Sequence, residues 1–326
     1  MKICVVGAGA IGGLCVAWLS KLGDIELCAL ARGQTLAQLR KDGLRFESTE
    51  GQTETIALRT SDQPQELGVQ DLIIVSVKAP SLAAVASQVA QMMDAKTMVL
   101  VAMNGVPWWF FDALPGAGKG LRLQSSDPAD RVRVCIPTSQ VIGCVVHIAS
   151  TNPNPGIVKH VMGNGLIIGE AFMGASTRVQ ELANVLTRAG FAITQSERIQ
   201  QDIWYKLWGN MTMNPVSVLT QARSDDIQGD DLVREFSSAV MREANTVGAR
   251  IGLPIEQTPE ERHLITRKLG SFKTSMLQDF EAQRPLELDA LVGSVREIAQ
   301  HVKVATPFLD ALFGMSRLLA KGKSLY

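Results

Sequence analysis

A glycine-rich turn at the start of the chain constrains the fold more than any other feature. Lys2–Val6 (KICVV) is a short apolar run, the GAGAIG sequence follows at once, and an apolar, helix-like segment comes next. This order is typical of the first βαβ unit of a dinucleotide-binding sheet. There, Gly7 permits the tight turn, Gly9 lets the backbone approach a pyrophosphate, and Gly12 lets the helix pack on the strand.

The same stretch has two other interpretations. A secretion signal also combines a basic residue, an apolar stretch and small residues, and glycines also occur in ordinary close packing. The position of the turn between a strand-like and a helix-like run favours nucleotide binding, with amides at the helix N-terminus facing the phosphates. The cofactor-binding residues expected in the turn are Gly7, Ala8, Gly9, Ala10, Ile11 and Gly12.

The residue after the second strand bears on the choice of cofactor. Ile25–Leu30 (IELCAL) is followed by Ala31 and Arg32. NAD enzymes of this fold usually carry an acidic residue here, which binds the ribose 2′-hydroxyl. Because a guanidinium suits a 2′-phosphate, Arg32 favours NADP(H). A solvated loop arginine is the alternative.

Two further apolar runs end in polar residues. Asp71–Val77 and Met98–Met103 are continuous apolar stretches, as expected of parallel strands buried on both faces. Lys78 follows the first run and Asn104 follows the second. Ligands of open α/β sheets collect outside the carboxyl ends of the strands. Lys78 and Asn104 are therefore predicted to lie near the cofactor.

The pattern changes from mixed to helical near Ser196. Before it, a glycine- and proline-rich stretch over 115–133 is expected to be a surface excursion. After Ser196, 3.6-residue periodicity replaces strand-like runs. The sequence predicts an α/β fold with a Rossmann-type dinucleotide-binding domain over 1–195 and an all-helical substrate and catalytic domain over 196–326. The other predicted strands are Arg133–Ile136, Gly143–Ala149, Gly156–Met162, Gly165–Gly169 and Phe191–Thr194, and the predicted helices are Thr177–Ala189, Ile199–Leu219, Asp231–Ile251, Pro259–Leu269, Pro285–Val302 and Pro307–Lys321.

The stretch WYKLWGNMTMNP carries aligned polar residues on a predicted helix. Lys206, Asn210 and Asn214 are four residues apart, so they share one face, while their neighbours are mostly apolar. A buried ammonium needs a partner, and a small molecule with a carbonyl and a carboxylate would supply one. The alternative is an ordinary solvated face. We expect the helix to bend or end at Pro215.

Composition excludes several classes of function. Thirty-two basic residues balance 32 acidic ones, which argues against nucleic acid or an anionic membrane as a partner. No apolar run reaches about 18 residues, so no membrane span is expected. Five scattered cysteines fit reduced thiols in a cytoplasmic protein, and four dispersed histidines predict no metal site.

With these pieces in place, the chain resembles the ketopantoate reductase (2-dehydropantoate 2-reductase) family almost from end to end. The motifs that carry the resemblance are GAGAIG from Gly7, Arg32, SVKA around Lys78, MNG around Asn104, KLWGNMTMNP from Lys206, TSMLQD around Ser275 and ELDALVG from Glu287. Several separated motifs in one order are more specific than the glycine turn alone. The resemblance implies NADPH-dependent reduction of ketopantoate to (R)-pantoate, on the way to pantothenate and coenzyme A.

The resemblance also implies roles for individual residues. Lys206 resembles the general acid, and Glu287 resembles a carboxylate that contacts cofactor or substrate. Lys78 and Asn104 resemble residues at the nicotinamide end, with Asn104 also near the substrate. The residues that resemble substrate ligands are Asn210, Asn214 and Ser275. A nearby ammonium suits this chemistry, because hydride addition to a ketone leaves negative charge on oxygen.

Three departures leave the substrate open. Ser224 stands where the family often has asparagine, and Trp108–Phe111 and the 115–133 excursion are bulkier than in the simplest members. The aromatic cluster is interpreted as core packing or an oligomer contact. A paralogous reductase of another 2-oxo acid and a non-catalytic NADPH-binding sensor are the alternatives. The sequence leaves a homodimer open.

Overall fold

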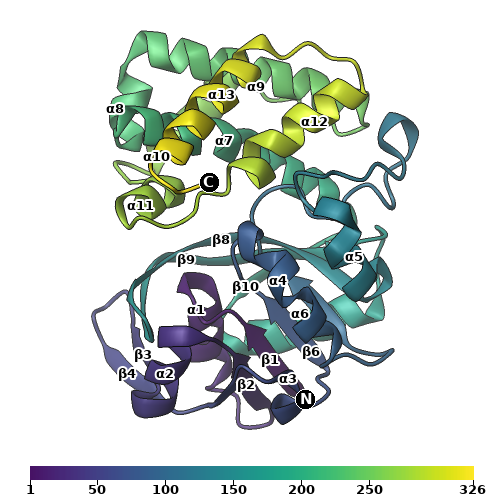
Figure 1. Cartoon of the computed structure of the whole chain (residues 1–326), viewed down its shortest axis with the longest axis vertical. Helices are drawn as coiled ribbons and strands as arrows, with labels where there is room; N and C mark the ends of the chain where they lie inside the picture. The colour runs from purple at the N-terminus through teal and green to yellow at the C-terminus, as the bar shows by residue number, and fades with distance from the viewer. The chain divides into compact units, whose positions relative to one another are not determined.

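The computed structural model describes all of residues 1–326, and the chain divides into two compact units. The first unit comprises Met1–Met103 and Asp130–Asp202. The second comprises Asn104–Ala129 and Ile203–Tyr326. Figure 1 shows strands and helices mixed in the first unit and helices alone in the long C-terminal part. The α/β fold class expected from the sequence is confirmed.

A ten-stranded sheet organises the first unit. Six strands follow the order β5-β2-β1-β6-β7-β8, and each neighbouring pair in that series is parallel. This is the Rossmann order, in which the direction of winding reverses between β1 and β6. Ligands of such sheets bind at that reversal. The strands are β1 (Lys2–Val6), β2 (Glu26–Leu30), β3 (Leu44–Glu47), β4 (Thr53–Ile56), β5 (Arg59–Ser61), β6 (Leu72–Val75), β7 (Met98–Val101), β8 (Val141–Asn154), β9 (Ile157–Glu170) and β10 (Ala192–Ser196).

The sheet continues beyond the Rossmann order through two long strands. β8 and β9 have 14 residues each and form an antiparallel pair. β9 also pairs in parallel with β10 and with β3, and β3 carries β4. Both long strands contact α1, and Figure 1 shows them arching past it. The two strands predicted over 156–169 are therefore one continuous strand.

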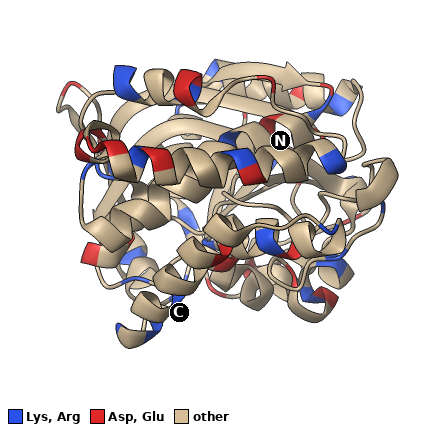
Figure 2. Cartoon of the chain, turned by 90° about the horizontal axis from the view of Figure 1, so that it is seen from above, with Lys and Arg blue, Asp and Glu red and all other residues tan.

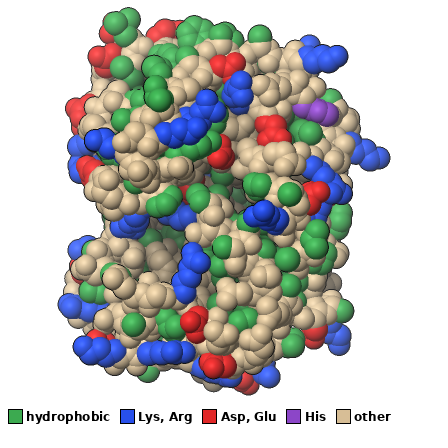
Figure 3. All heavy atoms as spheres, in the orientation of Figure 1, with side chains coloured by type: hydrophobic (Ala, Val, Ile, Leu, Met, Phe, Trp, Pro, Cys, Tyr) green, Lys and Arg blue, Asp and Glu red, His purple; other side chains and the backbone are tan.

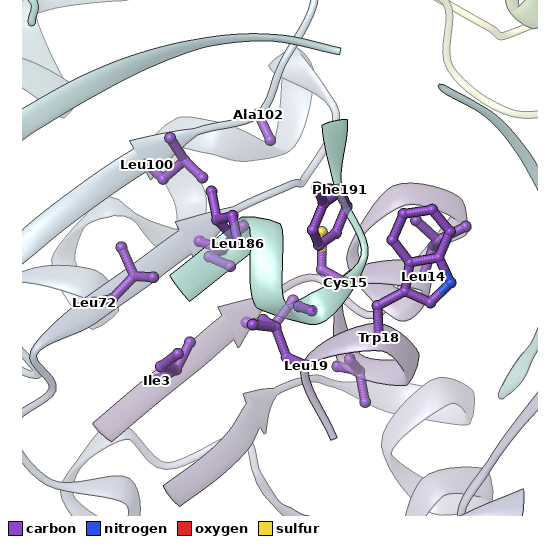
Figure 4. Packing of buried hydrophobic residues seen from close by; sticks show 14 of the residues in the cluster. Ile3, Leu14, Cys15, Trp18, Leu19, Leu72, Leu100, Ala102, Leu186 and Phe191 are labelled. Atoms are coloured by element: carbon purple, nitrogen blue, oxygen red, sulfur yellow. The ribbon is translucent and has the colours of Figure 1, made fainter. Parts of the chain in front are cut away.

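The core of the first unit forms around α1. From Gly12 to Leu19 every residue of this helix is buried, as expected of a helix that is apolar on all sides. Figure 4 shows Trp18 beside Phe191, and the centres of these rings are 4.6 Å apart. The helices of this unit are α1 (Ala10–Leu19), α2 (Gly33–Asp42), α3 (Pro64–Leu67), α4 (Ala79–Ala90), α5 (Arg131–Cys135) and α6 (Thr177–Ala189), with a short 3₁₀ turn η3 (Thr138–Gln140).

The second unit contains helices and no strands. Its α9 packs against α8, α10, α12 and α13, and α7 joins this group through Trp208, whose Nε1 donates to Met241 O (2.8 Å). The helices are α7 (Ile199–Thr220), which begins in the first unit, α8 (Ser224–Gly229), α9 (Asp231–Arg250), α10 (Pro259–Lys268), α11 (Ser275–Glu281), the π-helical η4 (Asp289–Gly293), α12 (Ser294–His301) and α13 (Pro307–Gly322), with 3₁₀ turns η1 (Gly116–Gly118) and η2 (Pro128–Asp130).

The units differ from the division expected at residues 195 and 196. Residues 104–129 group with the helical unit, because Val106 N donates to Ala290 O (3.2 Å) and Gln124 N donates to Glu297 Oε1 (2.8 Å). Trp109 and Phe110 are fully buried, which confirms the core-packing interpretation of that cluster. The 115–133 excursion is tied down at Glu297, whose Oε2 also accepts from Ser125 Oγ (2.7 Å).

One local prediction is wrong. Arg133–Ile136, predicted as a strand, overlaps the short helix α5, because β-branched residues in so short a run do not outweigh its packing on α4. Helix α7 continues through Pro215 to Thr220, one residue beyond the predicted end at Leu219. The turns that follow the proline are buried, with Val216 at 3% and Val218 at 0% exposure, so packing maintains the helix where one backbone hydrogen bond is lost.

Charged side chains of both signs are interspersed over the surface. Figure 2 shows acidic and basic residues alternating along the helices, and Figure 3 shows the same mixture on one face. No helix combines the length and apolarity needed to cross a bilayer. No group of three or more His, Cys, Asp or Glu side chains is arranged to hold a metal ion.

Candidate active site

The glycine turn adopts the geometry of a dinucleotide-binding loop. Gly7 has φ +91°, a conformation that favours glycine, and an added Cβ would lie 2.7 Å from Val77 Cγ1. An added Cβ at Gly12 would lie 1.9 Å from Gly7 O, so the helix contacts the turn directly. At Gly9 an added Cβ would meet no atom within 4 Å. Gly9 therefore borders open space just before α1, where a pyrophosphate would fit.

The ends of β1 and β6 are joined at this turn. Ser76, just after β6, donates from Oγ to Gly7 O (2.8 Å) and approaches Val6 O (3.2 Å). Lys78 follows two residues later as the N-cap of α4. The structure thus brings Lys78 and the glycine turn to the same edge of the sheet, at the winding reversal. The sequence prediction for Lys78 is consistent with this position.

Arg32 occupies the position expected for a residue that contacts the ribose 2′ group of the cofactor. It lies two residues after the end of β2 and is the N-cap of α2, with extended backbone. Its side chain is exposed, and the first turn of α2 has no acidic residue. An anionic group at this helix end would therefore meet a guanidinium and no opposing carboxylate from the first turn of α2.

Helix α7 presents the polar face predicted from the sequence. Lys206 and Asn210 are half-buried, and Asn214 is 5% exposed. Trp204, Leu207, Trp208 and Met211 are all buried, so the helix is largely enclosed. Lys206 Nζ donates to Asn104 Oδ1 at 2.9 Å. Two predicted site residues far apart in sequence are therefore in contact within the second unit.

The segment after Asn104 docks on the helical segment that follows Glu287. Gly105 has φ +89°, and an added Cβ there would lie 2.5 Å from Ala290 O. Only glycine fits this position, because both the backbone conformation and the close approach exclude a side chain. Glu287 is half-buried and lies three residues before Ala290. The MNG and ELDALVG motifs therefore meet through their backbones.

Ser275 is linked to the α7 face by two buried hydroxyl groups. It is exposed at the start of α11, directly after the N-cap Thr274. Thr274 Oγ1 lies 2.6 Å from Ser217 Oγ, and Ser217 Oγ donates to Asn214 O (2.7 Å). This link joins the first turn of α11 to the α7 turn that carries Asn214. No sequence pattern singles out Thr274 and Ser217, since hydroxyl residues are common at helix caps.

Ser224 has a structural role. It is 1% exposed, and its Oγ donates to Gly270 O (2.9 Å) and accepts from Phe272 N (2.9 Å). It thus fixes the loop that leads into α11 and Ser275. An asparagine side chain is longer than serine, so the departure from the family pattern changes how this loop is held.

A guanidinium packs beside the polar face of α7. The carbon of the Arg262 guanidinium lies 4.7 Å from the centre of the Tyr205 ring, and Arg262 Nη1 donates to Tyr205 OH (3.2 Å). An added Cβ at Gly209 would lie 2.9 Å from Arg262 Nη2, so the missing side chain makes room for the cation. Sequence reasoning missed this cluster, because 57 positions separate Tyr205 from Arg262.

A buried histidine lies next to α7. His263 is 5% exposed, its Nδ1 accepts from Gln228 Nε2 (3.1 Å), and its Nε2 donates to Ser238 Oγ (2.9 Å). Gln228 Nε2 also contacts Met213 Sδ (3.4 Å). Burial lowers the pKa of His263 below its usual value. This network supports α7 from the side of α8–α10.

Comparison with known proteins identifies the family of this chain. The family model described as ketopantoate reductase PanE/ApbA matches residues 3–172, and the model for its C-terminal part matches residues 198–320. A 2-dehydropantoate 2-reductase of Mesorhizobium japonicum is 36% identical over 100% of both chains.

Two solved structures extend the comparison. A provisionally assigned ketopantoate reductase from Ralstonia solanacearum is 52% identical, with a TM-score of 0.96 over 100% of this chain and 99% of that one. A 2-dehydropantoate 2-reductase from Methylococcus capsulatus is 26% identical, with a TM-score of 0.83 over 99% and 98% of the two chains. The matched ranges together include every motif residue placed above. This chain belongs to the ketopantoate reductase family.

Proposed function

We propose that this protein is an oxidoreductase that uses NADPH to reduce 2-dehydropantoate (ketopantoate) to (R)-pantoate in pantothenate and coenzyme A biosynthesis. The observation that carries the proposal is the 2.9 Å contact between Lys206 Nζ and Asn104 Oδ1, which joins two motifs of the family. Full-length similarity to a curated reductase supports the same assignment.

The dinucleotide fits the residues of the first unit. Gly7 supplies the turn, Gly9 borders open space, and the amides that begin α1 face a pyrophosphate. Ala8, Ala10, Ile11 and Gly12 complete the loop, and Lys78 stands at the same sheet edge. Arg32 binds the 2′-phosphate, which selects NADPH over NADH.

The second unit supplies the groups that act on the oxo acid. NADPH, when bound, provides the hydride that adds to the ketone carbon. Lys206 donates a proton from its ammonium to the ketone oxygen, so that the product is a hydroxyl group, and solvent reprotonates the amine. Asn104 orients the ammonium through its Oδ1.

Other polar residues bind the acid. Asn210, Asn214 and Ser275 hold the substrate, while Glu287 contacts cofactor or substrate as a fixed negative charge. We assign dinucleotide binding to residues 1–195. We assign binding of the oxo acid and proton transfer to residues 196–326, together with Asn104 from the first range. Five free cysteines support a reducing, cytoplasmic location.

An apolar stripe on α13 supports a homodimer. Phe308, Met315 and Leu318 are 47%, 51% and 73% exposed, and helical spacing puts them on one side. Sedimentation of wild type and Leu318→Glu tests this assignment. A wild type that is monomeric at micromolar concentration contradicts it.

The activity is tested by following NADPH oxidation with a panel of 2-oxo acids that includes ketopantoate. The expected result is the highest kcat/KM with ketopantoate, and loss of that activity in Lys206→Ala. A higher kcat/KM with another oxo acid would identify a paralogous reductase. NADPH binding without turnover of any oxo acid would identify a sensor instead.

A further inference from the structure

The last two residues of the chain form hydrogen bonds with the segment that carries Glu287. Leu325 is 3% exposed, and its carbonyl oxygen accepts from Leu286 N (2.9 Å). Tyr326 donates from its hydroxyl to Asp289 Oδ1 (2.7 Å). Lys321 Nζ lies 5.3 Å from the centre of the Tyr326 ring, which holds the ring from the side of α13. Leu286 and Asp289, which form these bonds, lie one residue before and two residues after Glu287.

Glu287 stands at the start of an irregular helix. Its carbonyl accepts from Leu291 N (3.1 Å), and the π-helical turn of η4 begins two residues later. Residues at a helix start lack intrahelical partners for their own N–H groups. The backbone on either side of Glu287 therefore contributes to the direction of its side chain.

The carboxylate of Asp289 lies close to Gly293 and is bonded to Tyr326. Its Oδ1 lies 3.0 Å from the position that a Cβ of Gly293 would occupy, so the carboxylate folds back over the glycine one turn later. The Tyr326 hydroxyl bonds to that same oxygen. The tyrosine thereby holds the carboxylate in place over the π-helical turn.

The same segment also contacts the residues beside Asn104, the partner of the proposed proton-transfer group Lys206. Ala290 O accepts from Val106 N (3.2 Å), and Gly105 packs against the same carbonyl. The preceding residue, Asn104, accepts the hydrogen bond from Lys206. One short segment is thus bonded both to the last two residues and to the backbone beside Asn104.

We propose that Tyr326 and Leu325 are positioning residues that set the orientation of Glu287 relative to Lys206 and Asn104. This inference rests on the proposed function, since it assigns Glu287 a role toward substrate or cofactor. Neither tail residue contacts a reactant in this account. Their effect is transmitted through Leu286 and Asp289.

A purely structural anchor would behave differently. It would lower the melting temperature without altering kinetics in the fully folded protein, and its effect would not depend on Glu287. A positioning role requires that the effect of Tyr326 disappear when the Glu287 carboxylate is removed. The phenol-to-phenyl change is suited to this comparison because it keeps the ring and removes only the hydroxyl.

The test compares wild type, Tyr326→Phe, Leu325→Ala, Glu287→Gln and the double variant Tyr326→Phe/Glu287→Gln, well below their melting temperatures. Asp310→Asn is the matched control, because it weakens a single side-chain bond between α13 and α12, from Arg296 Nε (2.6 Å). We expect Tyr326→Phe to lower kcat/KM for the oxo acid about threefold to tenfold, the range given by one net hydrogen bond. The KM for NADPH should change less than about twofold, while the control retains wild-type kinetics.

In the Glu287→Gln background, Tyr326→Phe should have no further effect on kcat/KM. Wild-type kinetics in both tail variants, or equal losses with and without the Glu287 carboxylate, would overturn the inference. Hydrogen exchange of the amides in 286–293 gives a readout that needs no substrate. Faster exchange in the tail variants than in Asp310→Asn is expected, and unchanged exchange also overturns the inference. Failure of the proposed function would instead appear in the wild type, as absence of oxo acid reduction.

Discussion

The Nζ atom of Lys206 lies 2.9 Å from Oδ1 of Asn104, although 102 positions separate the two residues. Asn104 follows the last residue of the first unit's N-terminal segment, whereas Lys206 lies on α7. The carboxamide oxygen can only accept, so it fixes the direction of one N–H bond of the ammonium. An oriented ammonium is the arrangement that a proton donor to a ketone oxygen requires.

Lys206→Ala should abolish most turnover and leave the fold and NADPH binding nearly intact. The loss should appear mainly in kcat, because the ammonium acts when negative charge builds on the substrate oxygen. Removing a positioned acid typically lowers the rate about 10²–10⁴-fold. Steady-state kinetics on a verified substrate measures this, with the exposed Lys268→Ala as control.

Lys206→Arg should rescue little activity, because a guanidinium is bulkier and does not release its proton. A Lys206→Ala enzyme that kept more than about a tenth of wild-type kcat would contradict the assignment, since that lies outside the range for a general acid. Lys78 would then be the next residue to test.

Asn210→Ala and Asn214→Ala should each raise KM for the oxo acid. The helix tolerates alanine, so the change removes a carboxamide and leaves its backbone in place. NADPH affinity should stay nearly constant, because neither asparagine is among the proposed dinucleotide-binding residues. Melting temperatures serve as the control, above all for Asn214, which is 5% exposed. Unaltered kinetics in both variants would show that the aligned face does not bind substrate.

Arg32→Ala should reduce the preference for NADPH over NADH. A charge-assisted contact with the 2′-phosphate contributes about 1.5–3 kcal/mol, so NADPH binding should weaken by that amount while NADH binding is little affected. Dissociation constants for both dinucleotides provide the measurement. Arg40→Ala, on the last turn of the same helix, is the matched control. Equal affinities of the wild type for the two dinucleotides would remove Arg32 from the site.

Substitution of alanine for two glycines of the turn should affect different properties, NADPH binding in one case and stability in the other. Gly9→Ala should fold normally but bind NADPH weakly, because the new methyl group enters open space that the pyrophosphate would use. Gly12→Ala should destabilise the fold by about 1–3 kcal/mol or more, because its Cβ would lie 1.9 Å from Gly7 O. Thermal unfolding and dinucleotide titration separate the two effects. Gly23→Ala, also in open surroundings, should change neither quantity.

Stability should fall as the pH drops below about 6.5 because of His263. Burial lowers the pKa of this histidine from its ordinary value of 6.5, with Glu260 opposing and Arg234 adding to the shift. Below pH 6.5 the unfolded chain therefore binds the proton first, which favours unfolding. The slope reaches at most about 1.4 kcal/mol per pH unit for one proton. Urea unfolding between pH 5.5 and 7.5 should show a weaker dependence in His263→Gln, and an identical dependence in both proteins would contradict this account.

The sequence predicted the parts of the fold that local pattern determines. Thr177–Ala189 was predicted at its observed bounds, because Ser176 caps it and Gly190 ends it in the left-handed conformation. The strands β1, β6 and β7 were recognised from continuous apolar runs. The glycine turn was recognised because its three glycines serve the tight turn, the approach of the pyrophosphate and the packing of the helix on the strand.

The features of the fold and of the candidate site that were not predicted depend on contacts between residues far apart in the sequence. Residues 104–129 join the helical unit through bonds to Ala290 and Glu297, and no local periodicity reports such bonds. The link from Thr274 through Ser217 to Asn214 and the packing of Arg262 on Gly209 have the same origin. The candidate site residues were predicted from motifs, whereas their mutual contacts required the folded chain.

The π-helical turn at Asp289–Gly293 makes the site tolerant of a change in chain length at this one point. A π turn accommodates one residue more than an α-helical turn closed by the i to i−4 bond. Deletion of one residue there would leave a regular α-helical turn, and the residues on either side would keep their directions around the axis of α12. The same deletion inside α12 would instead rotate whatever precedes it by about 100°. Relatives that differ by a single-residue gap in the π turn would therefore carry the same glutamate in the same place.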